Sequence, residues 1–238
     1  MRTPSVREGL AVIKKYFSEP IDSVIDVGVL SGTDFLMGEF PKAHHYLFEP
    51  VVIYHDMIRK AYGSVGIPNT LIGGAVSDTV GTMFQHLLSS DFSGKVTHSQ
   101  LLPTADAQRF GGQLLEIQET PVVTLDAWAA DQNLGKNYIV KIDVDGIEEK
   151  VIAGGQKVLS NAAIVVIEAH LLSLTSRARA LENLGLKLFD IVGNAYYFDQ
   201  LQQVDLVFLS SRIINENIDF QPWKKTGRVI WEEWKQFT

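Results

Sequence analysis

The stretch that decides the fold runs from Tyr138 to Glu148 and reads Tyr-Ile-Val-Lys-Ile-Asp-Val-Asp-Gly-Ile-Glu. Its first five residues, 138–142, form a nearly continuous apolar run, which is typical of a strand covered on both faces. Acidic residues and a glycine follow at once, and residues 147–159 then place apolar side chains at helical spacing. A buried strand, an acidic turn and a helix in this order are typical of one unit of a parallel α/β sheet.

The same order of strand, turn and helix recurs along the chain. Strands are expected at 23–27, 45–48, 70–74, 138–142, 163–167, 187–191 and 204–209, and helices at 33–40, 52–62, 147–159 and 173–184. Strands that alternate with helices predict an α/β fold, in which a mostly parallel sheet carries helices on both faces and the crossovers are right-handed.

We expect a single domain over residues 1–238 with three additions to the alternating pattern. They are an N-terminal helix at 1–20, an insertion between the third and fourth strands at 79–136, and an aromatic tail at 212–238. The insertion is too long for one crossover. It is expected to hold a strand at 81–88, a polar stretch with three glycines and a short helix near 125–132.

Composition excludes several classes of protein. The 21 Lys and Arg against 28 Asp and Glu give a formal net charge of −7, which argues against nucleic-acid or anionic-membrane partners. No apolar run approaches the roughly 20 residues that a membrane span needs. The absence of Cys excludes disulfides, thiolate metal sites and a cysteine nucleophile. The first residues lack the apolar core of a signal peptide, so we expect a cytoplasmic protein.

The expected strands end in acidic residues at one edge of the sheet. The five acids that follow successive strands are Asp26, Glu49, Asp78, Asp143 and Glu168. Ligands of an open parallel sheet bind beyond the carboxyl ends of its strands. We therefore expect the functional site at this edge.

The turn after the first strand, Gly28-Val29-Leu30-Ser31-Gly32, can bring the backbone close to a ligand. It reads G-x-x-x-G and not the dinucleotide pattern G-x-G-x-x-G, which disfavours an NAD-dependent oxidoreductase. Glu49 follows the next strand, where a carboxylate can accept hydrogen bonds from both hydroxyls of a ribose. A ligand with a ribose and a part without phosphate fits S-adenosylmethionine, a cation that an acidic edge attracts.

Asp143 and Asp145 admit several interpretations. Asp145 precedes a helix and can cap it, whereas Asp143 lies closer to the sheet and is the better candidate for binding or catalysis. Two acids one residue apart are also compatible with a divalent metal ion, with Glu168 and His170 as further ligands. Their D-x-D form is that of a metal-dependent glycosyltransferase, which is the first alternative function.

His170 is the histidine expected at the same edge, and histidine is the side chain that most often serves as a general base near neutral pH. His86, inside the insertion, is a weaker candidate on the substrate side. The other histidines, which are His44, His45, His55 and His98, are expected at the surface or in packing. Lys141 is expected to form a salt bridge with an acid.

Taken together, these motifs resemble those of the FkbM-type methyltransferases over about residues 20–210. The matching segments are Asp26-Val27-Gly28 with Gly32, Phe48-Glu49-Pro50, Ala75-Val76-Ser77-Asp78 with Gly81, Thr124-Leu125-Asp126, Lys141 to Glu148, and Glu168-Ala169-His170. The resemblance implies a class I, Rossmann-like fold of seven strands with the last one antiparallel. It also implies S-adenosylmethionine as methyl donor, and a hydroxyl on a sugar, glycan or other natural product as acceptor.

Under the methyltransferase hypothesis, we divide the candidate residues between two roles. Cofactor binding is assigned to Asp26, Gly28, Gly32, Glu49, Asp78 and Asp143, and catalysis to His170 and Asp143. Val29-Leu30 stand where the family usually has Ala-Asn, so a non-catalytic binding protein on the same fold remains a further alternative. The expected partner is a small-molecule or glycan acceptor, without nucleic acid or a membrane span, and a homo-oligomer is compatible with the sequence.

Overall fold

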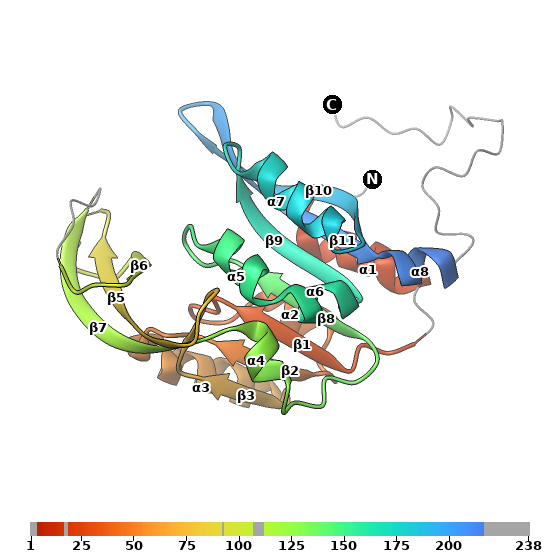
Figure 1. The fold of residues 1–238 in the computed structure, drawn as a ribbon, viewed down its shortest axis with the longest axis horizontal. Helices are drawn as coiled ribbons and strands as arrows, with labels where there is room; N and C mark the ends of the chain where they lie inside the picture. The colour runs from red at the N-terminus through yellow and green to blue at the C-terminus, as the bar shows by residue number, and fades with distance from the viewer. Residues whose placement is uncertain (1–3, 17–18, 92, 107–111, 217–238) are drawn as a thin grey trace.

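The computed structural model describes residues 4–16, 19–91, 93–106 and 112–216. Its main sheet has seven strands in the order β10-β11-β9-β8-β1-β2-β3 (Figure 1). Their bounds are β1 Ser23–Val27, β2 His44–Phe48, β3 Asn69–Ile72, β8 Tyr138–Ile142, β9 Ile164–His170, β10 Leu186–Tyr197 and β11 Gln200–Ser210. Neighbouring strands from β3 to β9 run parallel, and β11 is antiparallel to both β9 and β10. The predicted α/β fold with an antiparallel last strand is confirmed.

Helices cover both faces of this sheet. One face carries α1 (Val6–Tyr16), α2 (Asp34–Glu39), the 3-10 helix η1 (Val52–Tyr54), α3 (His55–Val65) and, after β11, α8 (Ser211–Glu216). The other face carries α4 (Leu125–Ala129), α5 (Glu148–Gly154), α6 (Gln156–Asn161) and α7 (Leu174–Asn183). Within the described parts of the chain, no helix is both long and apolar enough to cross a membrane.

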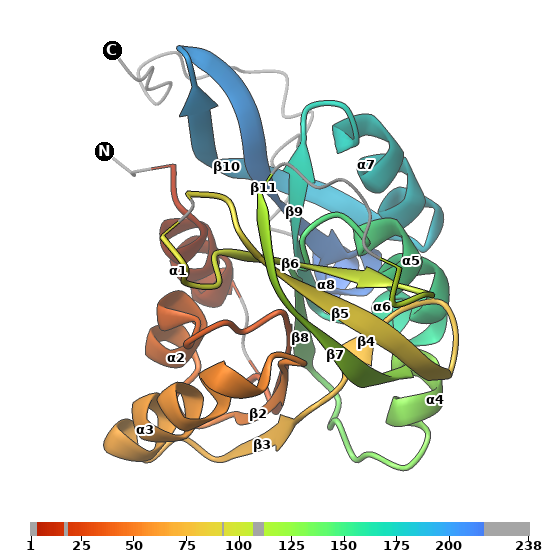
Figure 2. The ribbon, with the colours of Figure 1, turned by 90° about the vertical axis from the view of Figure 1, so that its left-hand side faces the viewer.

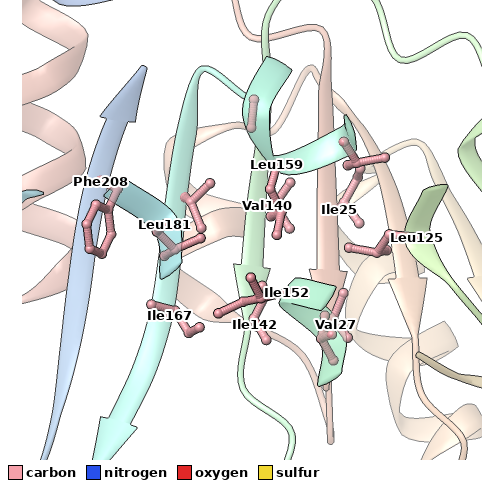
Figure 3. Packing of buried hydrophobic residues seen from close by; sticks show 14 of the residues in the cluster. Ile25, Val27, Leu125, Val140, Ile142, Ile152, Leu159, Ile167, Leu181 and Phe208 are labelled. Atoms are coloured by element: carbon pink, nitrogen blue, oxygen red, sulfur yellow. The ribbon is translucent and has the colours of Figure 1, made fainter. Parts of the chain in front are cut away.

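The strands are apolar on both sides because both faces are buried. In β1, Ile25 and Val27 point to the face of α4 to α7, where they pack with Leu125 and Ile152 (Figure 3). Val24, which precedes Ile25 in the strand, packs on the opposite face with α1 and α2. This alternation follows from the two-residue period of a strand. The two apolar layers hold the carboxyl ends of β1, β2 and β8 at a common level.

The helix expected over 147–159 is divided into α5 and α6. Gly155, between them, has a φ of −127° and lies outside the helical region. A Cβ on Gly155 would lie 2.9 Å from a side-chain carbon of Leu125 in α4. The close approach of α4 therefore explains why a glycine stands at the break between the two helices.

A second sheet lies in the segment between β3 and β8, with the order β4-β7-β5-β6 (Figure 2). Its strands are β4 (Ala75–Val76), β5 (Gly81–Ser89), β6 (His98–Leu102) and β7 (Gln113–Val123). Of these strands, only the one at 81–88 is predicted from the sequence, and the polar stretch expected after it contains β6 and the start of β7. Polar and apolar residues are mixed in β6 and β7, and their buried residues are few. The aromatic tail, with Trp223, Trp231 and Trp234, lies outside the described residues except for its first turns, which include α8.

Candidate functional site

A cavity lies where the carboxyl ends of β1, β2 and β8 face the second sheet. Its empty volume, part of it open to solvent, is about 860 Å³. The main sheet contributes Gly28, Leu30, Phe48, Glu49, Pro50, Asp143, Asp145 and Ile147 to its lining, and the second sheet and the segment before β6 contribute Ala75, Val76, Gln85, Val96, Thr97, His98, Ser99 and Leu101. The edge of the sheet at which the sequence predicts the functional site is therefore the edge where the cavity lies, and the second sheet covers it.

Glu49 is fixed in the wall of this cavity by backbone amides. Its Oε2 accepts a hydrogen bond from the N–H of Leu30 at 2.7 Å, and its Oε1 accepts one from the N–H of Val51 at 2.8 Å. The side chain is almost fully buried, and this burial raises the pKa of its carboxyl. The carboxylate thus connects the turn after β1 to the turn after β2.

A glycine is required at position 28 because the turn after β1 passes very close to the backbone that follows β8. It has a φ of +89°, and a Cβ at this position would lie 1.8 Å from the carbonyl oxygen of Asp143. The next turn residue on the cavity side, Leu30, also has a positive φ, of 57°, which presents its N–H to Glu49. Gly32 ends the same turn with its N–H bonded to the carbonyl of Val29, and the described residues that line the cavity do not include Gly32.

Lys141 forms ion pairs with two acids beneath the turn after β1, in agreement with the salt bridge that the sequence predicts. Its Nζ lies 3.3 Å from Asp26 Oδ1 and 3.3 Å from Asp143 Oδ2, and it also donates to the carbonyl of Gly28. Burial opposes the charge, but the two carboxylates outweigh it and raise the pKa of Lys141. Asp26 is fully buried beneath the turn and supports it from below, whereas the half-exposed Asp143 reaches the cavity.

Three acids stand in a row on neighbouring strands at this edge. Asp143 follows β8, Glu168 lies in β9, and Asp205 of β11 is paired in register with Glu168. Burial, followed by the charge of Asp143, raises the pKa of Glu168 to about 8 and that of Asp205 to about 6. The Nε2 of Gln203 donates to Glu168 Oε1. Glu168 and Asp205 can therefore bind a proton close to neutral pH.

Asp145 does not cap α5, and that interpretation is wrong. Its φ is 50°, and its Oδ2 accepts a hydrogen bond from the N–H of Ser99 in β6 at 3.1 Å. On the other side of the cavity, the hydroxyl of Tyr54 donates to the carbonyl of Val96 at 3.1 Å. The segment 96–99 is thus tied to the main sheet on both sides of the cavity that it covers.

Glu148 supports the turn after β8 in place of Asp145. Its Oε1 accepts hydrogen bonds from the N–H groups of Val144 and Gly146. Its other oxygen forms an ion pair of 2.6 Å with Arg177 of α7, and both side chains are almost completely buried. Arg177 also donates to the carbonyl of Glu168 at 2.7 Å, so it braces the acid row from behind.

Two other predicted residues lie away from the cavity wall. His170 is exposed at the end of β9, and Asp78 is exposed and accepts a hydrogen bond from the hydroxyl of Ser77. The described lining residues include neither of them. Their roles in catalysis and cofactor binding stay predictions. His98, which the sequence places among surface or packing histidines, does line the cavity, and His86 is buried in β5 with its Nε2 bonded to the carbonyl of Thr104.

The carboxylates of Asp143 and Asp145 do not converge on a common point, as ligands of one metal ion would. They are directed to different partners, Lys141 and the N–H of Ser99. Among residues 4–16, 19–91, 93–106 and 112–216, no group of three or more His, Asp or Glu side chains is arranged to hold a metal. The same divergence leaves the D-x-D interpretation without support from geometry.

Comparison with known proteins gives a family match for most of the chain. The sequence model described as "Methyltransferase FkbM domain" matches residues 26–192. No curated protein matches the chain.

Several solved structures have a similar course of the chain at low sequence identity. Precorrin-6y C5,15-methyltransferase from Geobacter metallireducens is 13% identical, covers 84% of this chain and 86% of its own, and has a TM-score of 0.44. A putative RNA methyltransferase from Pyrococcus horikoshii is 9% identical, with coverages of 85% and 80% and a TM-score of 0.46. Magnesium protoporphyrin IX methyltransferase from Synechocystis, solved with bound S-adenosylmethionine, is 10% identical, with coverages of 85% and 76% and a TM-score of 0.45.

Proposed function

The chain belongs to the FkbM methyltransferase family, and from this premise we propose that it transfers the methyl group of S-adenosylmethionine to a hydroxyl oxygen of a sugar, glycan or other natural product. Dependence on S-adenosylmethionine follows from the family. The choice of oxygen as acceptor is supported by one observation, the row of carboxylates formed by Asp143, Glu168 and Asp205. An alcohol is a poor nucleophile until its proton leaves, so an oxygen acceptor needs such a row more than an amine does.

The residues of the cavity fit the chemistry of this cofactor. The carboxylate of Glu49 suits the two hydroxyls of a ribose, because each of its oxygens keeps a second lone pair beside the amide bond that it already accepts. Asp143, half-exposed at the same wall, suits a cationic ammonium or sulfonium group. Phe48, Val51 and Val76 supply the apolar surface that a planar base requires.

When bound, S-adenosylmethionine would supply a methyl group from its positively charged sulfur, and the leaving group would be the neutral thioether S-adenosylhomocysteine. The acceptor oxygen forms the new bond to carbon and loses its proton, so charge and atoms balance when a carboxylate takes that proton. We assign this task to Asp143, which lines the cavity, with Glu168 behind it as the carboxyl to which the proton passes and Lys141 holding Asp143 in place. Glu49 and the turn at Gly28 hold the reactants in position, and such positioning supplies several kcal/mol in enzymes generally.

Asp143→Asn tests the proposal directly. We expect turnover in a methyl-transfer assay with S-adenosylmethionine and a panel of hydroxylated glycans to fall about 100-fold or more. The matched variant is His170→Ala, which alters the exposed histidine of the next strand. If His170→Ala lost most of its turnover while Asp143→Asn kept full turnover, His170 and not Asp143 would be the proton acceptor. An absence of S-adenosylhomocysteine binding to the wild type in calorimetry would refute the proposed function.

The pH dependence of methyl transfer is expected to follow Glu168. The rate should rise with pH as this carboxyl ionises, with an apparent pKa near the value of about 8 that burial and Asp143 impose. Glu168→Gln should remove this limb from the profile. The sign for stability is opposite: a raised pKa favours the protonated folded state, so the stabilisation is present below the unfolded value of 4.5 and is lost as pH rises through about 8. A flat rate profile between about pH 6 and 9 in the wild type would contradict the assignment.

A further inference from the structure

Gln85 of β5 is a buried polar residue that the proposed chemistry leaves without a task. It is 4% exposed and lines the cavity from the side of the second sheet. Within the described residues, its side-chain oxygen Oε1 has no hydrogen-bond partner. Leaving a buried acceptor unpaired costs free energy, so a native protein rarely keeps one without a reason. A ligand that donates a hydrogen bond at this point supplies such a reason.

The position of Gln85 indicates which part of a ligand it meets. Gln85 stands directly opposite Leu101 in the β5–β6 ladder. Leu101 packs in one cluster with Ala75, at the entrance to the second sheet, and with Ile147, after β8. Gln85 therefore lies beside Leu101 in the apolar part of the lining formed by Ala75, Leu101 and Ile147, here called the apolar end of the cavity, whereas Gly28 lines the cavity from the turn after β1.

The connectivity of the cofactor matches this order. Under the proposed function, Glu49 holds the ribose, and the turn at Gly28 with Asp143 faces the amino-acid part. The adenine base is attached to the opposite side of the ribose, so it extends toward the apolar end. An adenine has two flat apolar faces and an edge with a 6-amino donor beside ring-nitrogen acceptors, and a glutamine amide is complementary to that edge.

We propose that Gln85 selects the nucleobase of the cofactor, with its Oε1 accepting a hydrogen bond from the 6-amino group of adenine. Gln85 of the second sheet thereby binds the polar edge of the base, whereas Phe48, Val51 and Val76 contact its apolar faces. This inference rests on the proposed function, since it places an adenosyl group in the cavity. Asp78, which the sequence also assigns to the cofactor, is exposed, lies outside the described cavity lining and accepts a hydrogen bond from the hydroxyl of Ser77.

The test compares two ligands and three proteins by calorimetry. The ligands are S-adenosylhomocysteine and its purine-riboside analogue, in which a hydrogen atom replaces the 6-amino group. The wild type should bind the analogue about tenfold more weakly. Gln85→Leu should bind both ligands equally, with the affinity that the wild type has for the analogue.

Gln118→Leu is the matched control. Gln118 is the cross-strand partner of Gln85 on β7, its Oε1 is also buried without a hydrogen-bond partner among the described residues, and it does not line the cavity. This variant should discriminate between the ligands like the wild type. The thermal midpoint of unliganded Gln85→Leu should equal or exceed that of the wild type, because an unpaired buried oxygen is removed.

The outcomes separate the two proposals. If the wild type does not bind S-adenosylhomocysteine, the proposed function fails and the role of Gln85 fails with it. If the wild type binds it and Gln85→Leu still discriminates about tenfold, only the role of Gln85 is overturned. Equal loss of discrimination in Gln118→Leu, or a change confined to the KM of the acceptor in Gln85→Leu, overturns it too.

Discussion

Replacement of Glu49 by alanine is expected to weaken the binding of S-adenosylhomocysteine by about 100-fold, or about 3 kcal/mol. Two effects add to give this loss. The ribose hydroxyls lose a charged acceptor, and the N–H groups of Leu30 and Val51 lose the carboxylate that holds both turns in place. Calorimetric titration of the variant against the wild type measures the change.

Two further variants sharpen the result for Glu49. Glu49→Gln keeps an oxygen acceptor but not the charge, so its affinity should lie between those of the wild type and Glu49→Ala. Asp78→Ala removes an exposed carboxylate outside the described cavity lining and should cost less than Glu49→Ala. An unchanged dissociation constant in a folded Glu49→Ala protein would remove Glu49 from the site.

Replacement of Gly28 by alanine is expected to lower the free energy of unfolding by about 3 kcal/mol or more and to abolish cofactor binding. The new Cβ would lie 1.8 Å from the carbonyl oxygen of Asp143, which belongs to the backbone and cannot turn away. Either the turn after β1 or the end of β8 must move, and both carry cavity residues. Urea unfolding followed by fluorescence measures the stability.

Gly66→Ala separates steric conflict from backbone strain. Gly66 ends α3 with a φ of +69°, and a Cβ there meets nothing within 4 Å. This variant should therefore lose only the strain of a left-handed residue, about 1 kcal/mol. Comparable losses in Gly66→Ala and Gly28→Ala would show that contact with Asp143 adds nothing.

The central strands of the main sheet were predictable because β1, β8 and most of β9 are buried on both faces. Continuous apolar runs such as 163–167 and 138–142 indicate buried parallel strands when helical patterns lie between them. The second sheet lacks this signal. In β7, eleven residues include only two that are buried, so the pattern of Gln113–Val123 resembles that of a polar loop.

The acidic residues of the candidate site were predictable from the sequence, but the backbone N–H groups that bind them were not. Acidic residues at strand ends are visible in the sequence, and Glu49 and Asp143 do reach the cavity. The partners of Asp145 and Glu49 are backbone N–H groups, at Ser99 and Leu30, and any residue except proline carries such a group. The sequence favours the helix that follows Asp145 as its partner. The actual partner, the N–H of Ser99 in β6, lies far away in the sequence and leaves no local signal. Gln85 was missed for a related reason, since its importance lies in an unpaired oxygen.

The ends of the second sheet lie side by side, and this has an evolutionary consequence. The chain enters it through Ala75–Val76 and leaves it through Val122–Val123, and these two segments pair with each other in register. The segment between them can be exchanged as a cassette while the paired ends and the acid row stay in place. Changes in the length of this segment can thus accumulate in evolution without displacing the ends of β3 and β8, provided that Gln85 and residues 96–99 keep their places in the cavity lining.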